Sequence, residues 1–232
     1  MTRTAVYTAL ALRVRRSGEN REASFLCAEE GIVRATVFGG PKSSLRSAVA
    51  PFNAGRLLVY HDPVKDTRKV SEFDVSSWRP GLREVYERSE SASKICAAVL
   101  YSHGGGGSWP EALALAAGAL DALERAGAGA CRSLYLRFLW RWAGFLGQRP
   151  DLTRCSACAC EIPPDGVVWY RAGELYCPAC AAGSGLLVGA ESRRWLLSAE
   201  GSRPFTDRDA LPDPAVLSEA ETLARAVVHV AW

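Results

Sequence analysis

The sequence has no apolar run long enough to span a membrane. Its longest apolar stretches, such as 112–120, fall short of the roughly 20 residues that cross a bilayer. Residues 1–16 are apolar, but they alternate in polarity and lack a small-residue cleavage site, so we predict no signal peptide. These features favour a cytoplasmic protein that does not contact membranes, in a compartment where thiols stay reduced.

Signals of catalysis are also missing. The glycine loop at 103–108 lacks the Lys-Ser/Thr pair that ends a phosphate-binding P-loop, so we interpret it as a connector. We find no pairing of a nucleophile with a base, no carboxylate cluster and no His-x-Glu element of the zinc deaminases. The three histidines, His61, His103 and His229, have no partner at ligand spacing. We therefore predict that the protein is not an enzyme.

Basic charge is concentrated in the first third of the chain. Residues 1–80 contain 13 Lys+Arg against 8 Asp+Glu, whereas residues 81–232 contain 15 against 17. This distribution favours an anionic partner for the N-terminal segment. Most of the cations are arginine, which suits phosphate and base stacking, although a GC-rich genome would produce the same bias.

The same segment predicts a small β-barrel. Five short strands separated by turns, within about 75 residues, favour an OB-fold over an alternating β/α fold. OB-folds often bind single-stranded nucleic acid through a basic groove and exposed aromatic rings. The loop at 39–49 contains Gly, Pro and Ser and is expected to be irregular. The expected strands are 6–14, 23–28, 32–38, 52–61 and 69–75.

Strand arginines are the candidate contacts to phosphate. In the first strand, period two places Arg13 and Arg15 on the outer face. Arg34 is a third strand arginine available to phosphate, and for each of the three a solvated surface arginine is the alternative. The residues expected on the opposite, buried face are Val6, Leu10, Leu12 and Val14.

From about residue 81 the pattern becomes helical. Trp109-Pro110 followed by Glu111 is typical of a helix start. On a later helix, Arg137 and Arg141 lie four residues apart, as a solvated face or a phosphate contact, and we favour the solvated face. The expected helices are 82–101, 109–127 and 131–148, and then 190–200 and 213–231.

Five of the eight cysteines lie between residues 154 and 180. They include two CxxC knuckles, and the intervening segment 167–177 predicts the hairpin of a zinc ribbon. Two such knuckles supply four thiolates to one Zn²⁺ ion, and this closed site is structural. Buried or oxidised thiols are the alternative, and Cys160 could replace the second ligand in a shifted register. The expected ligands are Cys155, Cys158, Cys177 and Cys180.

These segments together predict an α+β protein with four parts. We expect an N-terminal OB-fold β-barrel at 1–80 and the first part of an α-helical domain at 81–150. A zinc ribbon with four cysteine ligands is inserted at 151–185, and the C-terminal helices of the helical domain follow at 186–232.

Three stretches, in order, resemble the RecO family of bacterial recombination-mediator proteins. Residues 8–40, TALALRVRRSGENREASFLCAEEGIVRATVFGG, are similar to the opening strands of that family's OB domain. Residues 39–52, GGPKSSLRSAVAPF, resemble its basic loop, and residues 134–158 resemble its helix, Pro-Asp-Leu and first zinc knuckle. The resemblance extends from residue 4 to about residue 200, and the order and spacing of the stretches carry it.

The resemblance implies a DNA repair protein that binds single- and double-stranded DNA and anneals complementary strands. With RecR, such proteins help RecA displace the single-strand-binding protein (SSB), and they bind the acidic C-terminal tail of SSB. RecF and RecA are implied as indirect partners, and the bacterial nucleoid as the location. Carried over to this chain, Lys42 and Arg46 match the basic loop positions and join the strand arginines as DNA-binding candidates.

The sequence departs from the family in two places. Ala159 and Cys160 follow the first knuckle where a glycine is common, which puts the tight turn there in doubt. The chain also ends at HVAW, where the family often continues into a basic tail. Two other functions stay open: a zinc-ribbon and OB nucleic-acid binder in transcription or RNA metabolism, and a protein–protein scaffold without nucleic-acid affinity.

Overall fold

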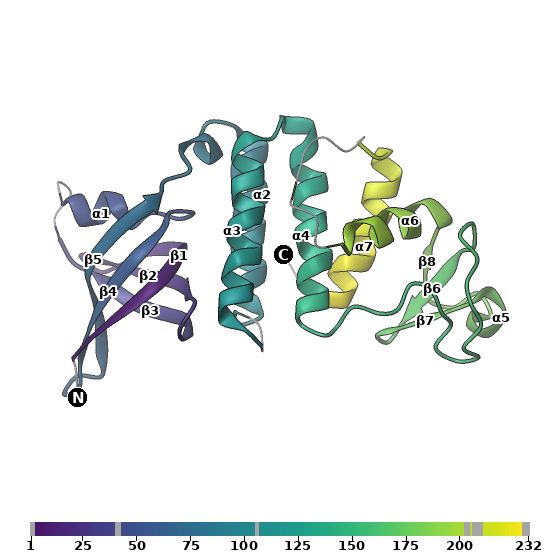
Figure 1. Cartoon of the computed structure of the whole chain (residues 1–232), viewed down its shortest axis with the longest axis horizontal. Coiled ribbons are helices and arrows are strands. Elements are labelled where there is room, and N and C mark those ends of the chain that lie inside the picture. Colours follow the sequence, from purple (N-terminus) through teal and green to yellow (C-terminus); the bar gives the residue numbers. More distant parts are fainter. Residues whose placement is uncertain (1–2, 40–42, 105–106, 202–204, 206–210, 229–232) are drawn as a thin grey trace. The chain divides into compact units, whose positions relative to one another are not determined.

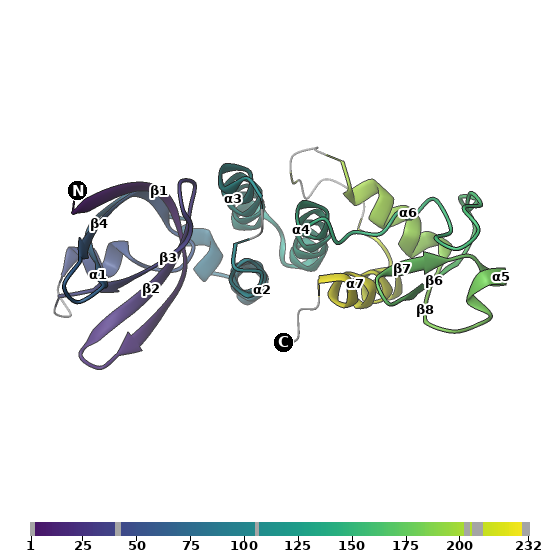
Figure 2. The same cartoon turned by 90° about the horizontal axis from the view of Figure 1, so that it is seen from below.

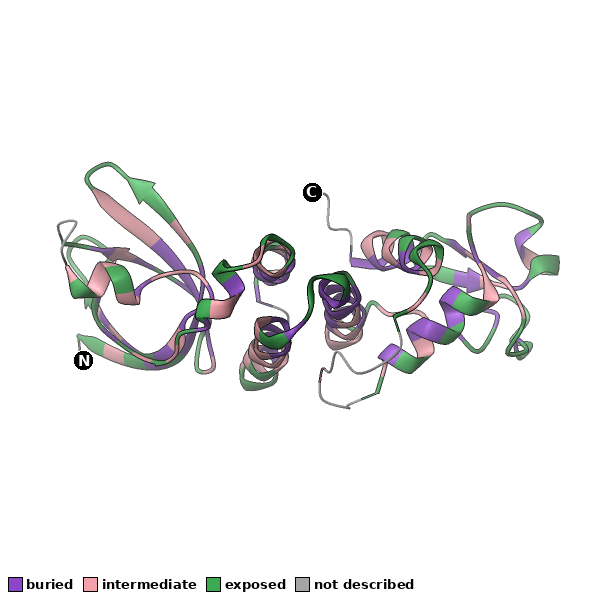
Figure 3. Cartoon of the chain, turned by 90° about the horizontal axis from the view of Figure 1, so that it is seen from above, coloured by how far each residue is buried: buried purple, intermediate pink, exposed green. Residues whose placement is uncertain are grey.

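The computed structural model describes residues 3–39, 43–104, 107–201, 205 and 211–228. Contacts divide the chain into two units, Met1–Ala128 and Gly129–Trp232, and each is described by itself (Figure 1). None of the described helices is both long enough and apolar enough to cross a membrane. Figure 3 shows buried residues in purple along the strands and helices of both units, with exposed residues in green between them.

The first unit begins with five strands that close into a barrel (Figure 2). Their order around the barrel is β1-β2-β3-β5-β4, with β4 returning to β1. The pairs are antiparallel except β3 with β5, which is parallel. This arrangement confirms the OB-like barrel predicted from the sequence. The strands are β1 (Thr4–Ser17), β2 (Asn20–Cys27), β3 (Gly31–Val37), β4 (Ala54–Asp62) and β5 (Thr67–Ser77).

The helices of the first unit follow and interrupt the barrel. The short helix α1 (Ser44–Ala48) lies in the loop that we expected to be irregular, and its Leu45 packs against the barrel core. A 3₁₀ turn, η1 (Pro80–Arg83), leads into α2 (Tyr86–Tyr101) and α3 (Trp109–Arg125). Both long helices contact β1.

The first half of β1 faces the opposite way from our prediction. Tyr7, Ala9 and Ala11 belong to the barrel core, whereas Val6 is 47 % exposed. Alternation alone could not assign the inner face, because both faces of this part of the strand carry buried apolar residues. Two residues that we predicted to point inwards are buried outside the barrel core, on a strand that α2 and α3 contact. These outward-facing residues are Leu10 and Leu12.

A bulge restores the predicted phase in the second half of β1. The pairing of β1 with β2 shifts register between Ala11 and Arg13. Beyond the bulge, Val14 packs against the barrel core, while Arg13 and Arg15 are exposed as predicted. An inserted residue in one strand reverses the side that each later side chain occupies, so a single bulge accounts for the change.

A buried arginine connects the barrel to the helices of the same unit. Arg79 is only 3 % exposed, and its Nε donates a hydrogen bond of 2.6 Å to Asp121 of α3. A terminal nitrogen of the same guanidinium donates to the backbone oxygen of Phe52, also at 2.6 Å. Phe52 precedes β4 and has a positive φ of 76°. Arg79 therefore holds a strained loop of the barrel against α3.

The second unit combines helices with a small sheet. Helix α4 packs on α6 and α7, and the three-stranded antiparallel sheet has the order β7-β6-β8. The predicted hairpin forms β6 and β7, whereas β8 was not expected. A 3₁₀ turn, η2 (Ala128–Ala130), precedes α4. The elements are α4 (Cys131–Phe145), β6 (Val168–Arg171), β7 (Glu174–Tyr176), α5 (Pro178–Ala181), β8 (Leu186–Val188), α6 (Ala190–Ala199) and α7 (Pro214–Val228).

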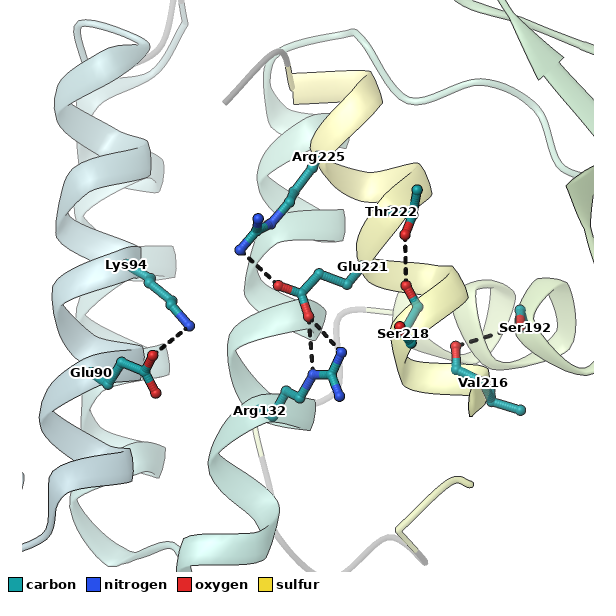
Figure 4. Close-up of polar contacts among 9 residues, drawn as sticks. All are labelled: Glu90, Lys94, Arg132, Ser192, Val216, Ser218, Glu221, Thr222 and Arg225. Atoms are coloured by element: carbon teal, nitrogen blue, oxygen red, sulfur yellow. Dashed lines mark hydrogen bonds and ion pairs between the residues drawn. The ribbon is translucent and has the colours of Figure 1, made fainter. Parts of the chain in front are cut away.

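Charged side chains connect α4 to α6 and α7. Glu221 of α7 accepts from Arg132 of α4 at 2.8 Å and pairs with Arg225 at 2.8 Å (Figure 4). Arg141 of α4 lies over the ring of Phe205 and donates to a backbone oxygen of α6. Arg137 lies over the ring of Trp195. Arg137 and Arg141 therefore contact aromatic rings and do not form the solvated face that we favoured.

We expect Arg79→Leu to lower the free energy of unfolding by about 2–3 kcal/mol, because it leaves a buried backbone acceptor and a carboxylate without their partner. Arg125→Leu, on the exposed end of α3, is the matched control and should change stability by less than about 0.5 kcal/mol. Urea unfolding measures both. Equal stability of the two variants would contradict this role of Arg79.

Candidate metal centre and nucleic-acid interface

The two CxxC knuckles bring four sulfur atoms together. The Sγ atoms of Cys155, Cys158, Cys177 and Cys180 all lie within 4.8 Å of one another, and the second and third of them are 3.9 Å apart. Four thiolates in a tetrahedron around a metal, with metal–sulfur distances of about 2.3 Å, have sulfurs about 3.8 Å apart. The cluster therefore has the geometry to hold one metal ion, with no ligand position left open.

Backbone amides favour ionised thiols in this cluster. The N–H of Cys177 donates to the Sγ of Cys155 at 3.3 Å, and this bond is the largest cause that lowers the pKa of Cys155 to about 6. The N–H of Cys180 likewise lowers the pKa of Cys177. By contrast, the thiol of Cys180 donates to the sulfur of Cys158, which raises the pKa of Cys180 to about 12. Complete ionisation of the four thiols therefore calls for a bound cation.

The first knuckle forms its tight turn without a glycine. Ala159 adopts a positive φ of 57°, and its N–H donates to the backbone oxygen of Cys155 at 2.9 Å. The left-handed conformation costs an L-residue about 1 kcal/mol. The turn leaves Cys160 exposed; its thiol contacts Cys158 and Cys177 but is not one of the four sulfurs of the cluster. Of the two registers that the sequence allowed, the structure brings Cys158 into the cluster.

A second buried arginine supports the knuckle from α6. Arg193 is 1 % exposed, and one of its terminal nitrogens donates to the backbone oxygens of Leu152 at 3.0 Å and Ile162 at 3.2 Å. The other donates to the backbone oxygen of Pro163. These carbonyls lie before and after the first knuckle, so one guanidinium fixes both ends of that loop. Nothing in the sequence distinguishes this arginine from its exposed neighbour Arg194.

Two of the predicted DNA-binding arginines lie in one row across the barrel. Arg13 on β1 is in register with Ser24 on β2, and Ser24 is in register with Arg34 on β3. Both arginines are exposed, and neither forms a hydrogen bond or ion pair with any residue that the structure describes. The side chains at Arg13 and Arg34 are therefore available to an anionic ligand on the outer face of the barrel.

The other three predicted arginine and lysine positions differ from these two. Arg15 is ion-paired with Glu22 at 2.7 Å, so its charge is partly neutralised. Arg46 is half-buried on α1, and its backbone oxygen accepts from Arg21. Lys42 lies outside the described residues. The structure thus groups Arg13 with Arg34 and places Arg46 beside the start of β2.

Further cations at the β1–β2 hairpin were not singled out from the sequence. Arg16 and Arg21 are paired across the hairpin, and Arg21 reaches α1. Nearby in the register, Lys69 of β5 lies over the ring of Phe38, which is 44 % exposed. Counting cations on both sides of the 17–20 turn would have revealed this basic end of the barrel.

Part of the chain matches a known protein family. Residues 83–190 match the family model described as "Recombination protein O C terminal". The matched segment covers α2, α3, α4 and the whole ribbon, and it ends at the first residue of α6. The search of the curated proteins found no significant match.

We expect Cys155→Ser to reduce bound metal and to lower the melting temperature by at least about 5 °C, because metal-binding energy is also folding energy. Cys160→Ser is the matched control, since this thiol lies in the same loop and contacts the cluster without being one of its four sulfurs. Elemental analysis and thermal unfolding of the purified chain measure both effects. Loss of metal in the control with full retention in Cys158→Ser would establish the shifted register instead.

We expect Ala159→Gly to stabilise the metal-loaded chain by about 0.5–1 kcal/mol, because glycine adopts a positive φ without steric strain. Ala157→Gly is the control: it lies in the same exposed knuckle without a positive φ and should be neutral or destabilising. Denaturant unfolding compares the two. A destabilised Ala159→Gly variant would show that the turn is not strained.

Proposed function

Because the chain belongs to the RecO family of recombination mediators, we propose that it binds single- and double-stranded DNA through its barrel and anneals complementary strands. With RecR it would promote loading of RecA onto single-stranded DNA coated with SSB. The acidic C-terminal tail of SSB is the proposed docking point, and RecF and RecA are indirect partners. The proposed place of action is the cytoplasm, at the nucleoid.

The row formed by Arg13 and Arg34 is the observation that supports DNA binding most directly. Two guanidiniums that pair with none of the described residues lie on one barrel face, two strands apart. Phosphate is the group on nucleic acid that such side chains bind, and it carries no sequence information. This chemistry suits a protein that acts on any sequence exposed in a DNA gap.

The cysteine cluster is proposed to hold one structural Zn²⁺ ion. Tetrahedral sites with four sulfur ligands are typical of zinc and of iron–sulfur proteins, and two CxxC knuckles on a small ribbon favour zinc. The ion would neutralise the thiolates and fold the ribbon. With four cysteine ligands there is no position for a substrate, so a catalytic role for the ion is not proposed.

We expect the protein to accelerate annealing of complementary oligonucleotides that are pre-coated with SSB, with a rate that falls as salt rises. Arg13→Glu/Arg34→Glu should abolish the acceleration and make single-strand binding less salt-dependent by about 1.4 in log–log slope. Lys42→Glu/Arg46→Glu tests the basic loop in the same assay.

The matched control is Arg56→Glu/Arg125→Glu, which changes the charge equally at two exposed arginines outside this row. It should retain most of the annealing activity. If the wild-type chain is folded and metal-loaded but shows no salt-dependent affinity for nucleic acid, the scaffold function replaces the mediator. Preference for RNA or duplex promoter DNA over bare single strands would favour the transcription or RNA alternative.

A further inference from the structure

A pocket of about 580 Å³ opens on the first unit beside the arginine row. This volume lies within the range of sites for small molecules, about 300–1,000 Å³. The walls come from the β2–β3 turn, β3, β5, the second residue after α2 and the first residue of α3. The lining residues are Glu30, Ile32, Arg34, Arg68, His103 and Trp109.

The indole of Trp109 lies against the backbone of Gly31 at this pocket. A Cβ atom added to Gly31 would lie 3.0 Å from Cε2 and from Cζ2 of Trp109, and 3.1 Å from Cδ2. Because these three ring atoms are equally close, the Gly31 backbone lies against the flat face of the indole. Gly31 also has a φ of +75°. The sequence therefore keeps a glycine where a side chain would displace the ring.

The loop after α2 is fitted closely to the same wall. A Cβ atom added to Gly104 would lie 3.0 Å from Cγ1 of Ile32. Ile32 thus gives the pocket an apolar side next to the half-buried indole. His103, immediately before Gly104, is exposed at the rim with a positive φ of 53°. Apolar and aromatic walls of this kind accept a flat ring.

The charges in the pocket leave one cation without a partner. Glu30 pairs with Arg68 at 2.6 Å and accepts from the hydroxyl of Tyr7 at 2.5 Å. The single negative charge of Glu30 is therefore already engaged by Arg68 and by the hydroxyl of Tyr7. Arg34 has no hydrogen bond or ion pair with the described residues, so the pocket retains a net positive charge. One phosphodiester group carries the matching single negative charge.

We propose that this pocket binds one nucleotide of single-stranded DNA, with its base stacked at Trp109 and its phosphate on Arg34. The inference rests on the proposed DNA binding and extends it to a defined base site. Continuity supports a strand as the occupant, because Arg34 ends the row that begins at Arg13. Base–aromatic stacking tolerates every base, as phosphate contacts do.

The test is a double-mutant cycle in which the ring of Trp109 is removed from the protein and the bases are removed from the DNA. Affinities are measured for a single-stranded oligothymidylate and for an abasic strand of the same length, which keeps the phosphates but has no bases. Trp109→Leu should weaken binding of the base-containing strand at least about fivefold and leave binding of the abasic strand unchanged. Trp109→Phe, which keeps a ring, should restore most of the loss.

Arg34→Gln is expected to weaken binding of both strands by the same factor, because it removes a phosphate contact. Arg56→Gln on β4 is its matched control and should leave both affinities unchanged. Thermal unfolding shows whether Trp109→Leu is folded. If it is not, photo-crosslinking of the wild-type chain to a strand with 5-iododeoxyuridine, mapped by peptide mass spectrometry, should identify Trp109.

The outcomes separate this inference from the proposed function. If wild-type binding is salt-dependent but Trp109→Leu weakens neither strand, or weakens both equally, the base site is wrong and DNA binding stands. In the crosslinking experiment, a DNA crosslink that maps elsewhere has the same meaning. No binding of either strand by wild-type chain would overturn both proposals. Free thymidine monophosphate binding as tightly as the strand would make the pocket a small-molecule site and overturn this assignment.

Discussion

The first unit depends on β1, which pairs with two strands and buries side chains on both of its faces. Its first half pairs with β4 and its second half with β2, and these two pairings close the barrel. Its inner face supplies Ala9 and Ala11 to the core, and its outer face buries Leu10 and Leu12 on the side of the helices. The bulge between Ala11 and Arg13 is also what turns Arg13 to the outer face, where it lies in one row with Ser24 and Arg34.

The cysteine cluster is a comparable constraint in the second unit, but it acts through charge. Val168 and Leu175 are buried between the knuckles, but a ribbon of this size has only a small core, and a metal bound by the four thiols would add its binding energy to the folding energy. The amides that lower the pKa of Cys155 and Cys177 prepare the ligands for that role. Arg193, bound to three carbonyls, closes the loop that presents the first knuckle.

The sequence predicted the elements well because each has a local cause. Turn residues separate the barrel strands, and the CxxC spacing dictates the cluster of four sulfurs. The sequence-based predictions failed where a structural feature depends on tertiary contacts. The inner face of β1 depends on helices more than 70 residues away, and α1 and β8 form against surfaces that no local pattern encodes. Arg15 and Arg34 look equivalent in the sequence, yet only the cross-strand register reveals that Glu22 neutralises one of them.

The two kinds of contact on the barrel have a shared consequence for strand annealing. In the proposed complex, Arg13 and Arg34 would hold the phosphates of the strand, and a base stacked on Trp109 would be held by the flat face of its ring. Neither contact uses the hydrogen-bonding edge through which bases pair. A strand bound in this way keeps those edges available to a complementary strand. A surface that read base edges would instead compete with pairing, so exposed arginines beside an aromatic ring suit annealing better than sequence recognition.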